Sequence, residues 1–259
     1  MSSLDQDRAE GEIERLRQAL DAETEARLDV ERKLDRANAE FEQFVSMAAH
    51  NLRQSLRDVA SFRQLMAETY ASRLDRDAGT FLDNIRDGAA SMESLLTDVV
   101  DYWATGTGDG RSSPTDMEAA FRQALLSLDK QIIETGAVVT HDALPRVCGD
   151  FATLTKVLYH LIRNAIQYRG TTSPRIHVSA RPDGPDWIFS VQDNGPGIDP
   201  AFQDRVFGVF KRLHGEAHPG NGLGLAFCRK AVESHGGRIR LESALGAGST
   251  FYFTLPSAD

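Results

Sequence analysis

Four glycine- and asparagine-rich blocks in the last third of the 259-residue chain limit most strongly what it can fold into. They are Asn164-Ala165, Asp193-Asn194-Gly195-Pro196-Gly197, Gly220-Asn221-Gly222-Leu223-Gly224 and Gly246-Ala247-Gly248-Ser249-Thr250. The first lies late in an apolar helical pattern, and the others fall at a strand end, a helix start and before a final strand. One glycine-rich loop is weak evidence, but four in this order predict a single nucleotide pocket built from helices and strands.

Composition and charge narrow the class of protein. Hydrophobic residues make up 41% of the chain and charged residues 26%, which is ordinary for a globular protein, and the formal net charge is -9. An acidic chain argues against nucleic-acid or anionic-membrane partners, and no apolar run approaches the roughly 18 residues of a membrane span. The acidic N-terminus is not a secretion signal. Cys148 and Cys228 stand alone, so we expect buried, reduced thiols in a cytoplasmic protein rather than a disulfide or metal site.

A heptad pattern runs through the first part of the chain and predicts a coiled coil over residues 1–40. Its seam is Ile13, Leu16, Leu20, Val30, Leu34, Ala37, Phe41, Phe44 and Ala48. Glu23 and Arg27 fall on the same seam, so their neighbourhood is the weakest part unless the two charges pair. A parallel dimer is the simplest interpretation. The alternative is a single amphipathic helix packed on its own chain.

Residues 41–105 show two further apolar stripes, which predict a helical hairpin. They are Leu52, Leu56, Val59, Phe62 and Met66, then Leu82, Ile85, Ala89, Met92, Leu96, Val99 and Trp103. A lone hairpin leaves much of these stripes in water, so dimerisation into a four-helix bundle is expected. The glycine-rich residues 106–114 then predict a linker.

Residues 115–259 change to a mixed pattern. Helical periodicity covers residues 121–133, 154–166 and 223–234, and strand patterns cover 137–140, 176–180, 187–191, 239–241 and 251–255. Helices and strands do not alternate strictly. We therefore expect an α+β sandwich rather than a Rossmann sheet.

Residues 47–57, Met-Ala-Ala-His-Asn-Leu-Arg-Gln-Ser-Leu-Arg, together with the four blocks, resemble sensor histidine kinases of two-component systems, in the phytochrome-like subgroup. The resemblance covers about residues 40–256. It implies a phosphoacceptor hairpin followed by an ATP-binding domain of the superfamily that includes gyrase, Hsp90 and MutL. It also implies ATP and Mg²⁺ as ligands, a homodimer, and transfer of the ATP γ-phosphoryl group first to His50 and then to a response-regulator aspartate.

His50 lies about 200° around the helix from both Ala48 and Leu52, so it points away from the apolar stripe. An exposed imidazole is largely neutral and can act as a nucleophile. The family has an acid immediately after this histidine and a proline five residues after it, whereas this chain has Asn51 and Ser55. Gln54 is either the amide that orients a hydrolytic water in related kinases or a solvated surface residue.

The resemblance assigns the pocket residues as follows. Asn164 holds Mg²⁺ through its amide oxygen, Asp193 accepts from the adenine amino group, and Gly195 and Gly197 let the backbone approach base and sugar. Phosphates meet the start of a helix at Gly220, Asn221, Gly222, Leu223 and Gly224, and Thr250 belongs to the purine rim with Gly246 and Gly248.

Several positions depart from the family or stay open. His160 replaces an asparagine and either contacts phosphate or only packs, and Gln167 replaces a lysine, which removes a positive charge. Tyr168 either stacks on adenine or packs. Lys211 and Arg212 either contact the phosphates or the phosphoacceptor helix, or they are a solvated basic pair. Residues 215–219 are the expected lid.

Two rival functions remain beside the histidine kinase. Asn51, Gln54 and Gln167 favour a phosphatase-biased or weakly active kinase, and a phosphotransfer or adaptor dimer that binds nucleotide poorly is the second rival. An unrelated ATPase of the superfamily fits less well, because of the His50 hairpin. No sensor domain is visible, so we expect the input from a partner protein or from outside this chain.

Overall fold

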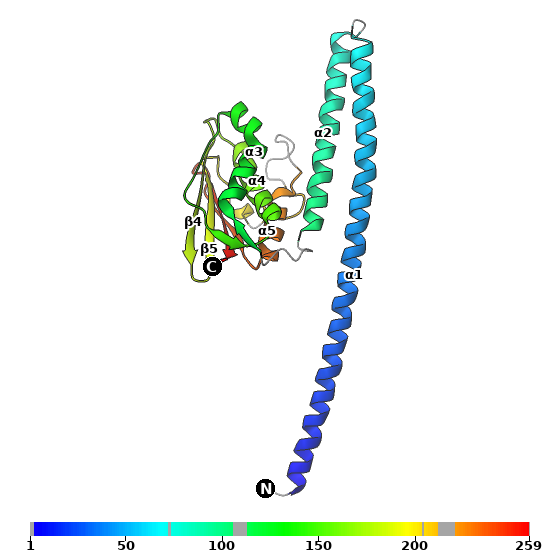
Figure 1. Ribbon diagram of the computed structural model, residues 1–259, viewed down its shortest axis with the longest axis vertical. Helices are drawn as coiled ribbons and strands as arrows, with labels where there is room; N and C mark the ends of the chain where they lie inside the picture. Colours follow the sequence, from blue (N-terminus) through cyan, green and yellow to red (C-terminus); the bar gives the residue numbers. More distant parts are fainter. Residues whose placement is uncertain (1–2, 72–73, 106–112, 204, 212–220, 259) are drawn as a thin grey trace. The chain divides into compact units, whose positions relative to one another are not determined.

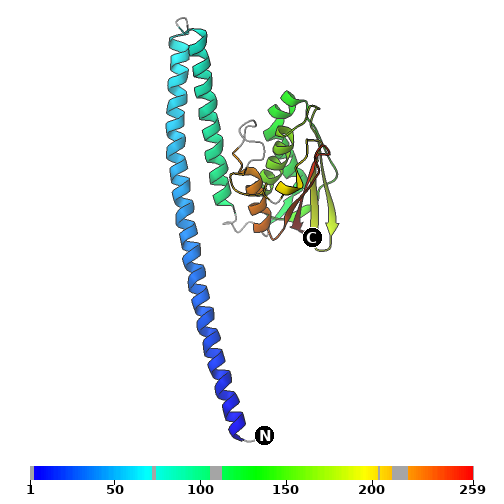
Figure 2. The same cartoon turned by 180° about the vertical axis from the view of Figure 1, so that it is seen from behind.

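The computed structural model describes residues 3–71, 74–105, 113–203, 205–211 and 221–258. The chain divides into two units, Met1–Leu52 and Arg53–Asp259. The first unit consists of one helix. The second holds a helical hairpin and a mixed α/β domain (Figures 1 and 2).

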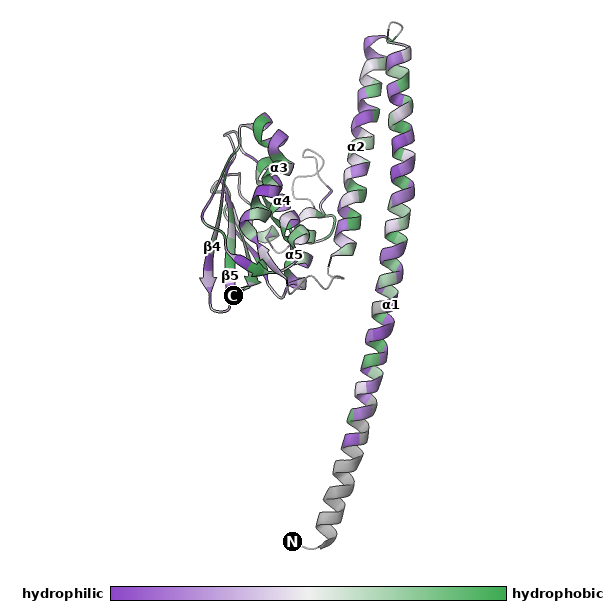
Figure 3. Cartoon of the chain, viewed as in Figure 1, coloured by the Kyte–Doolittle hydropathy of each residue, from purple (hydrophilic) through white to green (hydrophobic). Residues whose placement is uncertain are grey.

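Helix α1 (Ser3–Thr69) supplies the whole first unit, and its sequence contains no proline. Side chains of the predicted seam are well exposed in the single chain: Leu20 is 63%, Val30 64% and Leu34 58% exposed. Figure 3 shows hydrophobic and hydrophilic residues alternating along this helix. Arg27 forms an ion pair with Glu31 (3.4 Å), so this seam charge is partnered within its own helix. The described part of the seam is therefore largely uncovered, as the predicted coiled coil requires, while the coil itself stays a prediction.

The second unit begins with a hairpin of the end of α1 and helix α2 (Arg76–Ala104), which lie side by side in both views (Figures 1 and 2). The Asp75 carboxylate caps α2 by accepting a hydrogen bond from the Ala78 N–H at 2.8 Å. Leu82 is buried, but Phe62 (68%) and Met92 (58%) of the predicted stripes are exposed. The hairpin thus leaves much apolar surface in water, which is what a four-helix bundle would cover.

The α/β domain is built on a five-stranded sheet of order β2-β4-β5-β7-β6. Only β2 and β4 are parallel, and the other neighbours are antiparallel. The strands are β2 (Val138–His141), β4 (Arg175–Asp183), β5 (Asp186–Asp193), β6 (Ile239–Ser243) and β7 (Ser249–Pro256). A small second sheet pairs β1 (Pro114–Asp116) with β3 (Arg146–Cys148).

Helices α3 (Met117–Thr135), α4 (Phe151–Gln167) and α5 (Gly224–Ser234) cover one face of this sheet (Figures 1 and 2). Burial alternates along β7, which places every second side chain in the core. Phe189 and Phe253 stack with ring centroids 4.8 Å apart, and Leu161 of α4 is fully buried in the same cluster. Burying such side chains stabilises the fold by about 1.5–3 kcal/mol each.

The predicted helices and strands of this domain are all present, with ends shifted by a few residues. The short strands β1 and β3 and the 3₁₀ helix η2 (Pro200–Phe202) were not predicted, because three residues carry no readable periodicity. Pro114, expected in the linker, begins β1, and α5 begins at Gly224 rather than at Leu223. Helix α1 continues through residues 40–41, so the predicted boundary there is not a break in secondary structure.

The cysteine prediction is met in part. Cys148 and Cys228 are both free, but Cys148 is only half-buried. Cys228 is buried as expected, and burial raises the pKa of its thiol well above its usual range. Among the described residues, none of the helices is both long and apolar enough to cross a bilayer.

Candidate nucleotide-binding site

A cleft in the α/β domain brings together segments that lie far apart in the sequence. Its walls come from α4, the loop after β5, residues 206–211, the loop before α5 and the start of β7. The predicted site residues that line it are His160, Asn164, Tyr168, Asp193, Gly197, Lys211, Asn221, Gly222 and Gly224. Their assigned roles stay predictions, but the structure does place them around one cleft.

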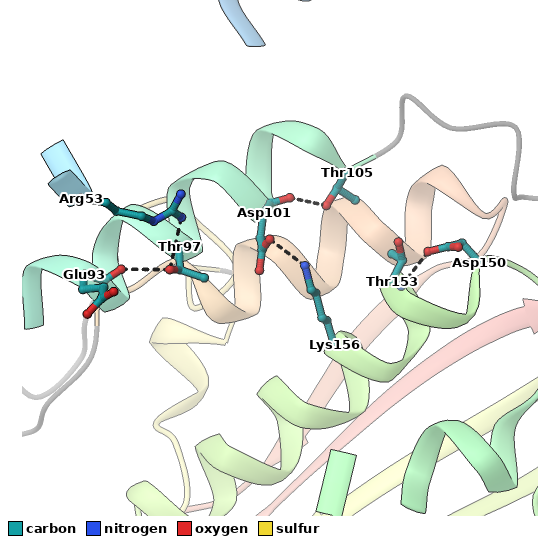
Figure 4. Close-up of polar contacts among 8 residues, drawn as sticks. All are labelled: Arg53, Glu93, Thr97, Asp101, Thr105, Asp150, Thr153 and Lys156. Atoms are coloured by element: carbon teal, nitrogen blue, oxygen red, sulfur yellow. Dashed lines mark hydrogen bonds and ion pairs between the residues drawn. The ribbon is translucent and has the colours of Figure 1, made fainter. Parts of the chain in front are cut away.

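Helix α4 positions the polar wall of the cleft. The Asp150 carboxylate caps the helix by accepting a hydrogen bond from the Thr153 N–H at 2.8 Å (Figure 4). Leu154, Leu158 and Leu161 bury its other side in the core. A helix turns about 100° per residue, so positions 160, 164 and 167 fall on one face. His160, Asn164 and Gln167 therefore all reach the cleft.

His160 is 7% exposed and lies against aromatic rings. Its ring centroid is 5.3 Å from that of Tyr159 and 5.1 Å from that of Phe227. A Cβ added at Gly224 would lie 3.0 Å from Nδ1 of His160, so the glycine lets the ring and the start of α5 pack closely. Burial, together with the charges of Arg163 and Lys156, lowers the pKa of His160 to about 3, and the ring is neutral.

Gln167 carries an unmet donor in the cleft wall. Its Nε2 is buried and has no hydrogen-bond partner among the described residues. Buried polar atoms nearly always have partners, because leaving one unpaired costs about 1–3 kcal/mol. An acceptor atom of a bound molecule would satisfy this donor, which is evidence for a ligand from the structure alone.

Asp193 stands at the end of β5 on the opposite side of the cleft. Its Oδ1 accepts hydrogen bonds from the N–H groups of Gly195 (2.8 Å) and Ser249 (3.1 Å). Burial raises the pKa of this carboxyl group, and the two backbone donors oppose the shift. Its Oδ2 accepts no hydrogen bond from the part of the chain that the structure describes, so one carboxylate oxygen is left to accept from a ligand amino group.

Two glycines, one predicted to let the backbone approach base and sugar and one predicted in the purine rim, adopt backbone conformations that other residues rarely take. Gly197 has φ +75° and Gly248 has φ +83°. A Cβ at Gly197 would overlap the Ala244 carbonyl group, and one at Gly248 would overlap that of Asp193. Side chains are therefore excluded where the loop after β5 meets the β6–β7 turn.

Several predicted pocket residues do not line the cleft, among them Gly246 and Gly248 of the purine rim. Gly195 acts through its N–H on Asp193, Leu223 is buried just before α5, and Thr250 pairs within the sheet opposite Gln192 and Glu242. Arg212 and Gly220, and the expected lid at residues 215–219, lie outside the described residues. The structure adds lining residues that the sequence did not single out: Arg163, Pro196, Ile198, Val206, Leu225 and Ser249.

The C-terminal end of α2 contacts the α/β domain through several polar interactions. The Lys156 ammonium group lies 2.6 Å from Oδ1 of Asp101 (Figure 4). Lys230 donates to the backbone carbonyl groups of Tyr102 (2.9 Å) and Trp103 (3.3 Å), where a cation meets the negative end of the helix. Asn221, which lines the cleft, donates to Oδ2 of Asp98 at 3.1 Å. Burial raises the pKa of the Asp98 carboxyl group, and the charge of Arg163 and this hydrogen bond oppose the shift.

The predicted acceptor residues lie on α1. The side chain of His50 is exposed, as its helical position predicts, and so is that of Asn51. Gln54 accepts a hydrogen bond from Arg57 (2.9 Å) and donates one to Asp58 (3.3 Å) on the helix surface. Both ends of the Gln54 amide thus have protein partners, which favours the solvated surface interpretation of this residue.

The residues present fit a nucleotide. An open carboxylate oxygen, an orphaned amide donor and the start of α5 are types of group that recognise a base and phosphates. No cluster of three or more histidine, cysteine, aspartate or glutamate side chains that could hold a metal occurs among the described residues. A divalent ion at Asn164 would therefore need ligand oxygens from the phosphates themselves.

The mixed sheet, its three covering helices and this cleft define a nucleotide-binding domain. Residues 149–259 match the family of histidine kinase-, DNA gyrase B- and HSP90-like ATPases. The chain is 43% identical over 224 residues to Cyanobacterial phytochrome A of Nostoc sp., covering 86% of this chain and 29% of that protein. It is 33% identical over 228 residues to the methanogenesis regulatory histidine kinase FilI of Methanothrix harundinacea, covering 87% of this chain and 26% of FilI.

A solved histidine-kinase structure also resembles this chain. ShkA, crystallised full-length in complex with AMPPNP, superimposes with a TM-score of 0.66 at 25% identity and covers 83% of this chain and 45% of its own. The chain is therefore a homologue of sensor histidine kinases and carries their ATP-binding domain. It spans under a third of the length of these two curated relatives, at 29% and 26%.

The carboxylate of Asp193 yields a first prediction. Asp193→Asn keeps the shape of the side chain but replaces a charged acceptor with an amide. We expect affinity for ATP to fall about 10- to 100-fold, the value of one hydrogen bond to a charged group, and preference for ATP over GTP to fall with it. Calorimetry with both nucleotides measures the two effects.

Asp183→Asn is the matched control, because Asp183 is exposed in the β4–β5 turn. It should bind ATP like the parent. Equal ATP affinity in Asp193→Asn and the parent would rule out the role of this carboxylate.

Proposed function

We propose that the chain is an ATP-dependent protein-histidine kinase that phosphorylates itself on His50 and passes the phosphoryl group to a response-regulator aspartate. The cleft carries this proposal, because it combines an open carboxylate oxygen at Asp193 with the polar face of α4. The exposed histidine upstream supplies the acceptor. The proposed domains are a coiled coil (1–40), an acceptor hairpin (41–105), a linker (106–114) and the ATP-binding domain (115–259).

In the proposed reaction the bond between the γ-phosphorus and its bridging oxygen breaks, and a bond forms to a ring nitrogen of His50. ADP leaves with the bridging oxygen, and the ring loses its proton to solvent. Phosphoryl transfer depends mainly on positioning and charge stabilisation. Arg163 and Lys211, which line the cleft, supply positive charge, and Mg²⁺ at Asn164 would neutralise phosphate charge.

A phosphatase-biased homologue is the second candidate, favoured by the residues around the acceptor. Asn51 lacks the negative charge that stabilises a histidine gaining positive charge, and Gln167 lacks the positive charge of a phosphate-binding lysine. The hydrogen bonds of Gln54 to Arg57 and Asp58 weaken this candidate, since they occupy the amide that would orient water.

Removing the acceptor tests the kinase proposal. His50→Ala should abolish all acid-labile, base-stable label from γ-labelled ATP, because no other residue takes the phosphoryl group. His177→Ala, which removes a partly exposed histidine from β4, should keep the label. Label that survives in His50→Ala would refute the acceptor assignment.

Restoring the family's acid tests the effect of Asn51. Asn51→Asp should speed autophosphorylation by about 10- to 100-fold, since one charge-assisted hydrogen bond contributes roughly 1–3 kcal/mol. ATP affinity should not change, because Asn51 is not part of the cleft. If the rate were unchanged or slower, His50 could still be the acceptor. The idea that the missing carboxylate limits the rate would then be wrong.

The uncovered stripes predict a homodimer at micromolar concentration. Phe62→Glu puts a charge on the exposed stripe of the hairpin and should shift the protein to monomer in sedimentation. Leu126→Glu alters an equally exposed leucine (71%) on α3 and should leave the dimer intact. A monomeric parent would contradict the prediction directly.

A further inference from the structure

Ser243 lies at the end of β6, opposite Ser249 of β7, and its hydroxyl group joins three segments beside the cleft. The oxygen accepts a hydrogen bond from the Ile198 N–H at 2.7 Å. It also lies 2.8 Å from the carbonyl oxygen of Gly248 and 3.0 Å from the hydroxyl oxygen of Ser249. Ile198 and Ser249 line the cleft, whereas Ser243 is not among the described residues that line it. Any effect of Ser243 on a ligand therefore passes through these neighbours.

These contacts fix where each hydroxyl hydrogen lies. A serine hydroxyl group has one hydrogen to donate and two lone pairs to accept with. The Gly248 carbonyl oxygen carries no hydrogen, so Ser243 donates to it, and the Ile198 N–H occupies one lone pair of Ser243. Ser243 then faces Ser249 with its second lone pair, so the hydrogen between them belongs to Ser249. The Ser249 hydroxyl group thus spends its hydrogen on Ser243 and keeps its lone pairs.

The backbone hydrogens of this wall are spent in the same way. The N–H groups of Gly195 and Ser249 donate to Oδ1 of Asp193. The Ile198 N–H donates to Ser243. Of these groups, Oδ2 of Asp193 and the lone pairs of Ser249 are left for a ligand, and Ser249 is only 6% exposed. The wall therefore presents acceptors: an amino group satisfies it, whereas a carbonyl oxygen there would be buried without a donor.

We propose that Ser243 is a positioning residue for base selection: it holds the Ser249 hydroxyl group as an acceptor, so that the cleft takes a 6-aminopurine and rejects a 6-oxopurine. The inference rests on the proposed function of the cleft as an ATP site. Without Ser243, the Ser249 hydroxyl group is free to turn and donate its hydrogen to a carbonyl oxygen. Asp193 supplies the negative charge that repels such an oxygen, and Ser243 prevents the neighbouring hydroxyl group from offsetting that repulsion.

The test compares ADP with inosine diphosphate (IDP), in which an oxygen replaces the amino group of the base. Displacement of the fluorescent analogue mant-ADP from the full chain, with MgCl₂ present, measures both affinities. The parent should prefer ADP by about 100-fold or more. Ser243→Ala should reduce this preference about tenfold, the value of one hydrogen bond, whereas Ser243→Thr keeps a hydroxyl group and should keep the preference. A merely structural role would weaken both nucleotides equally and leave their ratio unchanged.

Further variants show whether the effect passes through Ser249. Ser249→Ala should bind IDP no more weakly than the parent does, because the hydroxyl hydrogen that it removes is spent on Ser243. Adding Ser243→Ala to Ser249→Ala should then leave the preference for ADP unchanged. Ser190→Ala is the matched control, because Ser190 also pairs with a serine hydroxyl group, that of Ser179 at 2.7 Å, and neither is among the described residues that line the cleft. It should keep the parent's preference.

The outcomes separate this inference from the function on which it rests. No ADP binding by the folded parent would overturn the proposed function. If the parent binds ADP but Ser243→Ala keeps its preference over IDP, only the role of Ser243 is wrong. The same holds if Ser243→Ala changes the preference equally with and without the Ser249 hydroxyl group. Should Ser243→Ala fail to fold, Ser249→Ala decides: weaker IDP binding than in the parent would contradict the proposal, and equal or tighter binding would support it.

Discussion

The packing of helix α4 against the sheet is the constraint on which the site depends. Leucines along one side of the helix are fully buried, and the regular turn of the helix then fixes where every other side chain points. His160, Asn164 and Gln167 reach the cleft because Leu154, Leu158 and Leu161 are held in the core. Positioning of the polar groups is therefore provided by the hydrophobic core and needs no ligand.

This arrangement lowers stability at the site. The buried Nε2 of Gln167 lacks a partner among the described residues, and an unpaired buried polar atom costs about 1–3 kcal/mol. Gly197 and Gly248, both at positive φ, add backbone entropy to the cost of folding. The core offsets these costs, and a ligand that satisfied the open polar atoms would recover part of them.

The sequence predicts those parts of the molecule that depend on local pattern. Apolar periodicity identifies α3, α4 and α5, and the glycine blocks locate the loops of the cleft. Sequence patterns do not reveal that the Ser249 N–H donates a hydrogen bond to Asp193, because that contact joins residues 56 positions apart on two strands. Arg163 was not assigned to the site, although it lies three residues after His160 and four before Gln167, on the same side of α4. What covers the stripes of α1 and α2 depends on a second surface that one chain does not contain.

Asn221 occupies two environments at once, since it lines the cleft and donates to Asp98 at the end of α2. A ligand that took the N–H now given to Asp98 would have to break that bond, and the docking of α2 would then weaken by the free energy that ligand binding loses to the competition. Such a relation is reciprocal: pulling α2 away would release this N–H to a ligand in the cleft. Competition for one N–H would therefore couple the end of α2 to the pocket thermodynamically.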